Sequence, residues 1–180
     1  MRKISNLLFT TLISVGLIAS VIAITPPKQK KTNAERLHDA ILLYADSFDV
    51  PLNVAFNVAR METGYLGPNH DSYNHKQVSS CGALGAMQIM PRYASYFAGF
   101  KVNKQDLRDS IELNVYISMK TLRKHYNTYG DWKKSLGAYH TGKPVVNWYA
   151  KSGVKPNYKS YWVPEPFKEN TSDSLLVQED

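Results

Sequence analysis

Apolar residues recur at helical spacing in several stretches of the chain, and the first of these covers residues 32–48. Thr32 and Glu35 stand three apart, the spacing of a capping box that satisfies free N–H groups at a helix start. The apolar positions that follow are Leu37, Ala40, Ile41, Tyr44 and Phe48. Because they share one face of a helical wheel, we predict a helix over 32–48. Asp49 and Pro51 then predict a second helix that ends near Glu62.

The longest helical pattern covers residues 109–130. Asp109 and Glu112 have the spacing of another capping box, and the glycine at the end of the stretch is a natural stop. Residues 131–140 and 144–153 begin with aspartate and proline, so each predicts a further helix. No stretch shows the alternation of a half-buried strand. We therefore predict a mainly α, compact helical domain with an irregular loop or small hairpin, within residues 64–85, beside a cleft.

The two ends of the chain differ from this helical body. Residues 1–25 have a basic start and then a long uncharged apolar run, which is typical of a secretory signal peptide or a membrane anchor. Positive charges before such a run predict that the body crosses the membrane. We interpret residues 26–33 as a polar linker, 34–164 as the folded domain, and 165–180 as an acidic, disordered tail.

The composition fits one globular domain with an anionic partner. The 180 residues are 43% hydrophobic and 21% charged, a balance that supports a single core. The net charge of +7 indicates either a solvated basic surface or a polyanionic partner, such as nucleic acid, an anionic membrane or a wall polymer. We find no nucleic-acid-binding motif and expect no nucleic-acid partner. The single cysteine, Cys81, excludes an internal disulfide and is expected to be a small packing residue.

Glu62 is a charged residue on the apolar face of the second predicted helix. A helical wheel places it among Ala55, Val58 and Ala59, with Asn53, Asn57 and Arg60 on the opposite face. A carboxyl group in apolar surroundings tends to keep its proton, so its pKa rises toward neutrality and it can act as a general acid. The alternative is a structural glutamate paired with an arginine or with backbone donors.

Two later segments offer neighbours for this carboxyl group. The glycine-rich turn that ends in Gln88 lets the backbone approach a ligand closely, and the Gln88 amide can both donate and accept hydrogen bonds. Tyr139 falls on the inward face of its helix, where its hydroxyl group needs a partner. We expect a protonated Glu62 to be that partner.

Together these segments resemble the soluble lytic transglycosylase (SLT) domain of the lysozyme-like superfamily, over roughly Pro51 to Tyr161. The family's Glu-Ser block is similar to Glu62-Thr63, its Gly-Leu-Met-Gln block to Gly85-Ala86-Met87-Gln88, and its Ala-Tyr-Asn block to Ala138-Tyr139-His140. The segment around Asn114 resembles the helix between the second and third blocks. Tyr158, or alternatively Tyr161, matches the family's late tyrosine.

Three residues depart from the family pattern. Thr63 replaces serine and keeps a hydroxyl group, whereas Ala86 replaces leucine and alters packing or the sugar contact. His140 replaces an asparagine that helps to orient the substrate or the catalytic carboxyl group. Because a histidine is larger and titrates near neutral pH, we expect His140 to change pH sensitivity or efficiency without abolishing the chemistry.

The resemblance implies a lysozyme-like fold and a peptidoglycan lytic transglycosylase. Such an enzyme cleaves the β-1,4 bond between N-acetylmuramic acid and N-acetylglucosamine and leaves 1,6-anhydromuramoyl ends. Glu62 would act first as acid and then as base, without a second carboxylate. The implied substrate-binding residues are Thr63, Gly85, Met87, Gln88, Tyr139, His140 and Tyr158. The resemblance implies no cofactor and no metal, and His70, His75 and Cys81 lack the spacing of a metal site.

Two other functions stay open. A hydrolytic muramidase of the same fold would use a second carboxylate, for which Asp71 is the candidate. A catalytically weakened wall-binding component of a phage particle or envelope-spanning machine would explain His140. In each case we expect a monomer whose partners are peptidoglycan glycan strands and, through the N-terminal segment, the membrane. Its expected place is the periplasmic face of the inner membrane, the periplasm after signal cleavage, or a phage virion.

Overall fold

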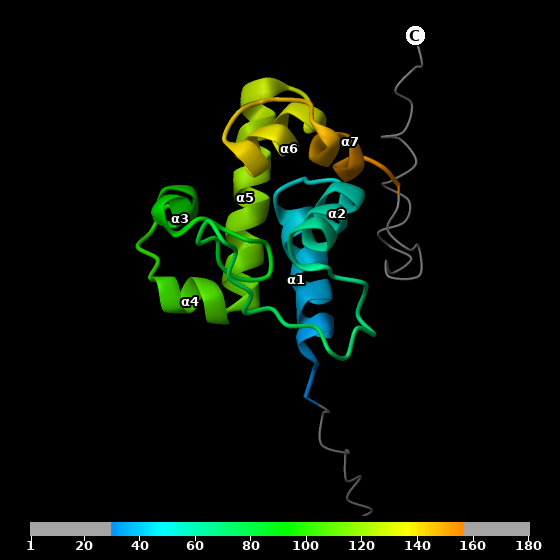
Figure 1. Ribbon diagram of the computed structural model, residues 1–180, viewed down its shortest axis with the longest axis vertical. Coiled ribbons are helices and arrows are strands. Elements are labelled where there is room, and N and C mark those ends of the chain that lie inside the picture. Colours follow the sequence, from blue (N-terminus) through cyan, green and yellow to red (C-terminus); the bar gives the residue numbers. More distant parts are fainter. Residues whose placement is uncertain (1–29, 157–180) are drawn as a thin grey trace, which may run out of the picture.

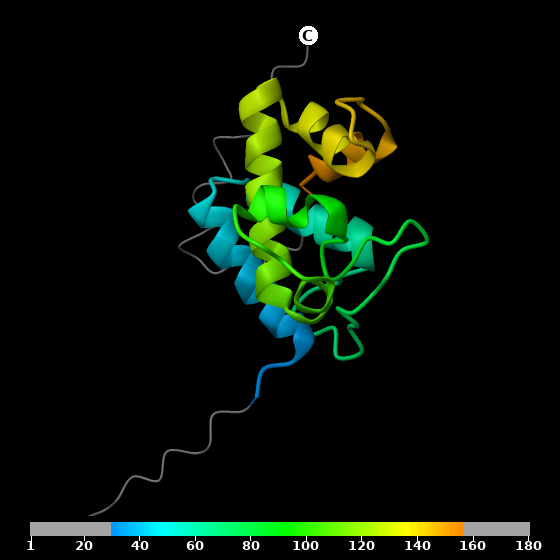
Figure 2. The same cartoon turned by 90° about the vertical axis from the view of Figure 1, so that its left-hand side faces the viewer.

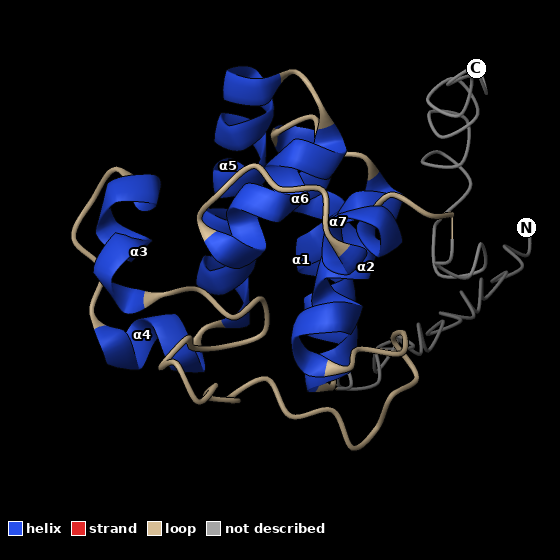
Figure 3. Cartoon of the chain, turned by 45° about the horizontal axis from the view of Figure 1, so that its top comes forward, coloured by secondary structure: helices blue, strands red, loops and turns tan. Residues whose placement is uncertain are grey.

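The computed structural model describes residues 30–156, and this part of the chain folds into seven helices joined by loops (Figure 1). The helices are α1 (Asn33–Ser47), α2 (Leu52–Thr63), α3 (Pro91–Ala98), α4 (Lys104–Asp109), α5 (Ile111–Tyr129), α6 (Trp132–Thr141) and α7 (Trp148–Gly153). Between residues 30 and 156 there are isolated antiparallel bridges, Val78 to Leu84 and Leu84 to Ile89, but no strand (Figure 3). The prediction of a mainly α domain with an irregular loop is confirmed.

The predicted N-terminal segment 1–25 and the predicted tail 165–180 lie outside the described residues. Within residues 30–156, none of the helices combines the length and the apolar character needed to cross a membrane.

Helix α5 lies at the centre of the described domain. Figure 1 shows α1 on one side of α5 and α3 and α4 on the other, and Figure 2 shows α3 crossing α5. The buried residues of α5 are divided between two apolar clusters. Val115 and Met119 face the larger cluster, and Ile117 faces the smaller one with Leu107 and Ala98. The helix therefore separates two cores.

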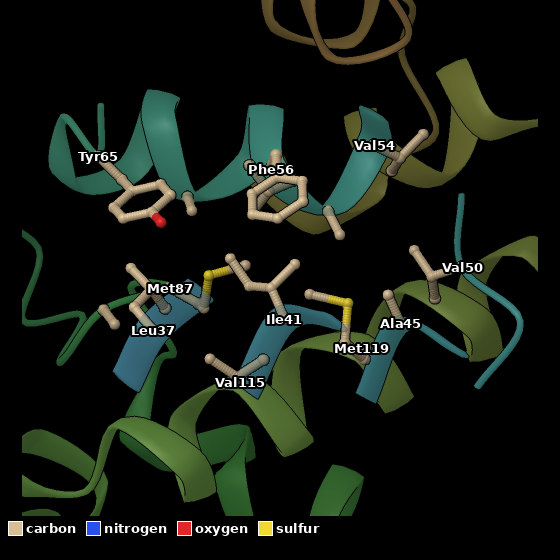
Figure 4. Close-up of a cluster of buried hydrophobic side chains, with 14 of the residues drawn as sticks. Leu37, Ile41, Ala45, Val50, Val54, Phe56, Tyr65, Met87, Val115 and Met119 are labelled. Atoms are coloured by element: carbon tan, nitrogen blue, oxygen red, sulfur yellow. The ribbon is translucent and has the colours of Figure 1, made fainter. Parts of the chain in front are cut away.

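The larger core lies between α1, α2 and α5 (Figure 4). Leu37 and Ile41 of α1 and Phe56 of α2 are at most 1% exposed. Tyr65, near the start of the long 64–90 connection, and Met87, near its end, pack into the same core. Burial of these side chains, at about 25 cal/mol per Å² of apolar area, anchors the loop to the helices.

Several predicted helix ends are confirmed, and one is wrong. The capping box of Thr32 and Glu35 is present in both directions, and Asp131 caps α6 by accepting from the Lys134 amide. The capping box of Asp109 with Glu112 is not formed, because Ser110 caps α5 by accepting from the backbone N–H of Leu113. Asp109 instead ends α4.

The predicted helix from Pro144 also begins later than expected. Residues 144–147 are a loop, and Asn147 caps α7 by accepting from the Ala150 amide. The Val145 backbone lies against Gly137 of α6 so closely that a Cβ atom there would collide with it. The 144–147 loop therefore packs directly against α6. Helix α7, which follows this loop, contacts α2.

Helices α3 and α4 have no counterpart in the sequence prediction. Each is short, with eight and six residues, so its apolar periodicity is weak. Their ends follow ordinary rules: proline opens α3, Gly99 closes it with a φ of 84°, and Asn103 caps α4.

The helical wheel of α2 predicts the burial of one face correctly and the burial of the opposite face only in part. Ala55, Val58 and Ala59 are fully buried, as predicted. Asn57 is also buried, because its amide donates to the carbonyl oxygens of Gly153 and Lys155. The end of α7 therefore covers the Asn57 part of this face, whereas Arg60 is exposed.

Candidate active site

The Glu62 side chain lies in the last turn of α2, beside Gly64, which ends the helix with a φ of 70°. A Glu62 carboxyl oxygen, Oε1, accepts a hydrogen bond of 2.6 Å from the hydroxyl group of Tyr149. Burial raises the pKa of Glu62 to about 7, and the bond from Tyr149 lowers it in part. The raised pKa that the helical wheel predicts is therefore present.

The predicted bond between Glu62 and Tyr139 is not formed. The Tyr139 hydroxyl donates to the Met87 carbonyl oxygen at 2.7 Å and lies 2.9 Å from the Ser118 hydroxyl. Its pKa is raised by burial and then by the charge of Glu62. Tyr139 is thus an electrostatic neighbour of Glu62, and its own hydrogen bonds hold the 85–88 turn against α5.

Tyr149 is the residue that the sequence analysis missed. It is 1% exposed, and burial together with the nearby Glu62 carboxyl raises its pKa. Its hydroxyl group therefore stays protonated and donates to Glu62. A buried tyrosine hydroxyl group needs a hydrogen-bond partner, and this rule holds for Tyr149 as well as for Tyr139. The partner of Tyr149 lies 87 residues away in the sequence, so no local pattern indicates it.

His140 contacts Tyr149 rather than Glu62. The two rings stack with centroids 4.3 Å apart and planes 10° apart, and Trp148 meets the edge of His140 at 5.9 Å. Burial lowers the pKa of His140, which favours a neutral ring near pH 7. The histidine therefore supports the ring whose hydroxyl group binds the catalytic candidate.

The turn of Gly85 to Gln88 is held by Asn114 of α5, which is fully buried. The Asn114 amide nitrogen donates to the carbonyl oxygens of Leu84 and Leu107, and its oxygen accepts from the Met87 N–H at 2.7 Å. Gly85 has a φ of 81°, and a Cβ atom there would lie 2.8 Å from the Leu107 carbonyl oxygen. This position therefore requires glycine.

Thr63 and Met87, both predicted to bind substrate, are buried. The Thr63 hydroxyl lies 2.8 Å from the Ala86 carbonyl oxygen and 2.8 Å from the Tyr73 hydroxyl. The Met87 side chain packs into the larger core (Figure 4). Their contacts tie the end of α2 to the 85–88 turn.

Gln88, Tyr139 and His140 line a groove of about 480 Å³. The other lining residues are Cys81, Ile89, Met90, Arg92, Tyr93, Tyr96, Phe97, Thr121, His125, Ala138, Thr141 and Gly142. Cys81 is exposed, so its predicted packing role is wrong. Glu62 does not line the groove and is connected to it through Tyr149 and His140. The hydrogen bond from Tyr149 and the raised pKa distinguish Glu62 as the candidate acid of this site.

The remaining candidates are Asp71, the residues considered as metal ligands and Tyr158. Asp71 is exposed on the 64–77 loop. Between residues 30 and 156 no group of three or more His, Cys, Asp or Glu side chains could hold a metal ion. Tyr158 lies outside the described residues.

Comparison of the sequence with known proteins identifies the family to which the chain belongs. The model of the family described as "Transglycosylase SLT domain" matches residues 39–161. A protein named "Transglycosylase" from Enterobacteria phage PRD1 is 34% identical over 85 residues, which cover 47% of this chain and 30% of the phage protein. The matched part of the chain thus spans less than a third of that relative's length. No solved structure matches. Because the family model covers well over half of the sequence, the chain belongs to the SLT transglycosylase domain family.

Proposed function

We propose that this protein is a peptidoglycan lytic transglycosylase that cleaves the bond between N-acetylmuramic acid and N-acetylglucosamine and forms 1,6-anhydromuramoyl ends. The observation that carries the proposal is the Glu62 carboxyl group, whose pKa is raised to about 7 and which accepts one hydrogen bond, from Tyr149. Near this pH both protonation states are populated, as one group that serves as acid and then as base requires.

The reaction would proceed in two steps at Glu62. Protonated Glu62 donates its proton to the glycosidic oxygen, and the bond from the muramoyl C1 atom to that oxygen breaks. The muramoyl 6-hydroxyl oxygen then bonds to C1, and the Glu62 carboxylate takes the hydroxyl proton. The enzyme returns to its starting state with no water consumed. The Tyr149 hydroxyl stabilises the carboxylate between the two steps.

The surroundings of Glu62 favour this route over hydrolysis by two carboxylates. The hydrogen bond to Glu62 comes from the Tyr149 hydroxyl group and not from a second carboxyl group, and Asp71 is exposed on its loop. A retaining glycosidase needs its two carboxyl groups about 5 Å apart. An internal hydroxyl group of the sugar meets the same need without a second carboxylate.

We assign the neighbouring residues by their contacts. Gln88, Tyr139 and His140 line the groove and would contact sugar, whereas Gly85, Thr63 and Met87 fix the turn that carries Gln88. Tyr149 binds Glu62 and is the strongest described candidate for the family's late tyrosine. Tyr158, which the resemblance matches to that tyrosine, stays the alternative for this place and for its substrate contact.

The test is a product analysis. Purified peptidoglycan is digested with the full chain, and the released fragments are separated and weighed. Anhydromuramoyl ends are the expected product, and new reducing ends would identify a hydrolytic muramidase instead. Sedimentation with cell-wall sacculi without any released fragment would identify a wall-binding component. The same proposal predicts action on the wall from its periplasmic side or from a phage particle, with the N-terminal segment as membrane anchor or signal.

A further inference from the structure

The connection between α6 and α7 exposes three large apolar side chains that are close together in the sequence. Val145 and Val146, in the connecting loop, are 45% and 44% exposed, and Trp148, the first residue of α7, is 65% exposed. We call these three residues the apolar tip. Figure 2 shows the loop at the outer edge of the domain. Exposed apolar side chains that cluster in this way are typical of a surface that contacts a partner.

The backbone that carries the apolar tip is fixed on both sides. The Val145 backbone packs directly on Gly137 of α6, where a Cβ atom would collide with it. The Thr141 hydroxyl group accepts a hydrogen bond from the Lys143 N–H at 3.3 Å, and the Asn147 side chain accepts one from the Ala150 N–H at 3.0 Å. The loop therefore holds its apolar side chains in solvent instead of folding them onto the core.

The surroundings of the apolar tip carry charge of one sign. The sequence from residue 132 to residue 156 contains no aspartate and no glutamate. The lysines of this segment are all exposed: Lys133, Lys134, Lys143, Lys151 and Lys155. Two of them, Lys143 and Lys151, stand on either side of the apolar tip in the sequence. The partner of this surface is therefore expected to be anionic.

The combination of tryptophan, branched aliphatic side chains and lysines matches an anionic lipid surface. Tryptophan is enriched where a protein meets the membrane–water interface, and lysines near that interface are attracted by anionic headgroups. An anionic glycan or nucleic acid would neutralise the lysines but would leave the two valines in water. A lipid surface accommodates both the apolar side chains and the lysines.

We propose that the apolar tip and its flanking lysines form a peripheral contact with an anionic lipid membrane. This inference goes beyond the proposed function and concerns the folded domain rather than the N-terminal segment. Trp148 is in ring contact with Tyr149 at 5.8 Å, and the Tyr149 hydroxyl donates to Glu62. A docked loop therefore holds the candidate active site close to the lipid surface.

The experiment uses a fluorophore on the loop as a local probe of lipid contact. The full chain carries Val146→Cys with Cys81→Ser, and the new thiol is labelled with a dye that brightens in an apolar environment. The vesicles are phosphatidylcholine alone or an equal mixture with phosphatidylglycerol. We expect brighter, blue-shifted emission on the mixed vesicles and little change on phosphatidylcholine. The matched control is the same dye at Leu43→Cys with Cys81→Ser, because Leu43 is 59% exposed on α1.

Charge and apolar variants in the labelled protein test the two parts of the surface separately. Lys143→Gln/Lys151→Gln should lower the ratio of lipid-bound to free loop by about twentyfold on the mixed vesicles. Val145→Ser should lower the same ratio severalfold. The matched charge loss Lys101→Gln/Lys104→Gln, at exposed positions before and in α4, should leave it unchanged.

Several outcomes would overturn the lipid contact. An unchanged emission at position 146 on both kinds of vesicle would do so, as would an equal change at positions 43 and 146, which would show that the N-terminal segment alone brings the protein to lipid. An equal response on both kinds of vesicle would remove the role of the lysines. A response to purified sacculi but not to vesicles would assign the surface to the wall polymer. Each of these results leaves the cleavage proposal intact.

Discussion

The Glu62 side chain combines a raised pKa with a single strong hydrogen bond. Burial would favour the neutral acid, and the 2.6 Å bond from Tyr149 favours the carboxylate. The two effects oppose each other and leave the pKa at about 7 rather than far above it. This balance has consequences for both activity and stability.

We predict that Glu62→Gln abolishes cleavage and yet raises stability above neutral pH. The Glu62 pKa is 4.5 in the reference state and about 7 when folded, so the folded protein holds a proton that the unfolded chain loses in this window. The free energy of unfolding of wild type therefore falls as pH rises from about 4.5 to 7, by at most roughly 3 kcal/mol. A neutral amide lacks this dependence.

The measurement is urea unfolding of wild type and variant at pH 4.5 and pH 8, together with cleavage assays. The variant should gain stability relative to wild type only at the higher pH. Retained cleavage would remove Glu62 from the mechanism, and a pH-independent stability difference would contradict the raised pKa.

Tyr149→Phe should shift the pH profile of cleavage. Without the donated hydrogen bond the carboxylate is less stabilised, so the pKa of Glu62 rises. Protonated Glu62 is the acid, and activity falls as pH rises through this pKa. The alkaline limb of kcat/KM should therefore move upward, by about one pH unit or less. Tyr126→Phe, at a tyrosine that stacks on Trp132, is the control and should leave the limb in place. A downward shift in Tyr149→Phe would contradict this role.

Among the helices and turns, the contact of α5 with the 84–88 turn matters most for the site. The Asn114 side chain makes two hydrogen bonds to this turn, at Leu84 and Met87, and a third to the Leu107 carbonyl oxygen of α4. We predict that Asn114→Ala lowers the free energy of unfolding by about 2–4 kcal/mol, because buried backbone groups lose their partners. Thermal melts would measure the loss. Asn127→Ala, on the exposed surface of the same helix, should cost less than about 0.5 kcal/mol. An equal loss there would contradict the assignment of the Asn114 effect to its buried hydrogen bonds.

The sequence predicts these elements well where the determining contacts are local. Thr32 with Glu35 and Asp131 act within one helical turn, and both caps are present. Asp109 has the same spacing from Glu112, but the neighbouring Ser110 is the N-cap of α5 instead. Helices α3 and α4 are too short for periodicity to separate them from loop.

The site was predictable only in part, because its decisive contacts join distant segments. The helical wheel locates Glu62 on a buried face and predicts its raised pKa, since both follow from α2 alone. Choosing between Tyr139 and Tyr149 as its partner requires the position of α7 relative to α2. That position depends on Gly137, against which the Val145 backbone packs, and on Asn57, which binds the end of α7. Neither contact leaves a periodic pattern in the sequence.

For the protein as a unit, the net charge of +7 predicts a salt-dependent reaction on an anionic wall. Raising the salt concentration from about 0.05 M to about 0.5 M shortens the Debye length severalfold. We predict that kcat/KM on intact sacculi falls severalfold over this range, as measured by fragment release. Cleavage of a short soluble fragment of the same glycan, which carries far fewer negative charges than a sacculus, is the comparison and should change less. Equal salt dependence on both substrates would place the effect in the catalytic step rather than in wall encounter.

Cys81 makes the groove directly observable. It is exposed, it lines the groove with Gln88, and the sequence holds no other cysteine. A thiol-reactive fluorophore would therefore label one known position without any engineered residue. Its emission would change as a ligand displaces water from the groove walls, so occupancy could be followed in real time, independently of bond cleavage. The natural sequence thus supplies its own reporter for the entry and departure of substrate.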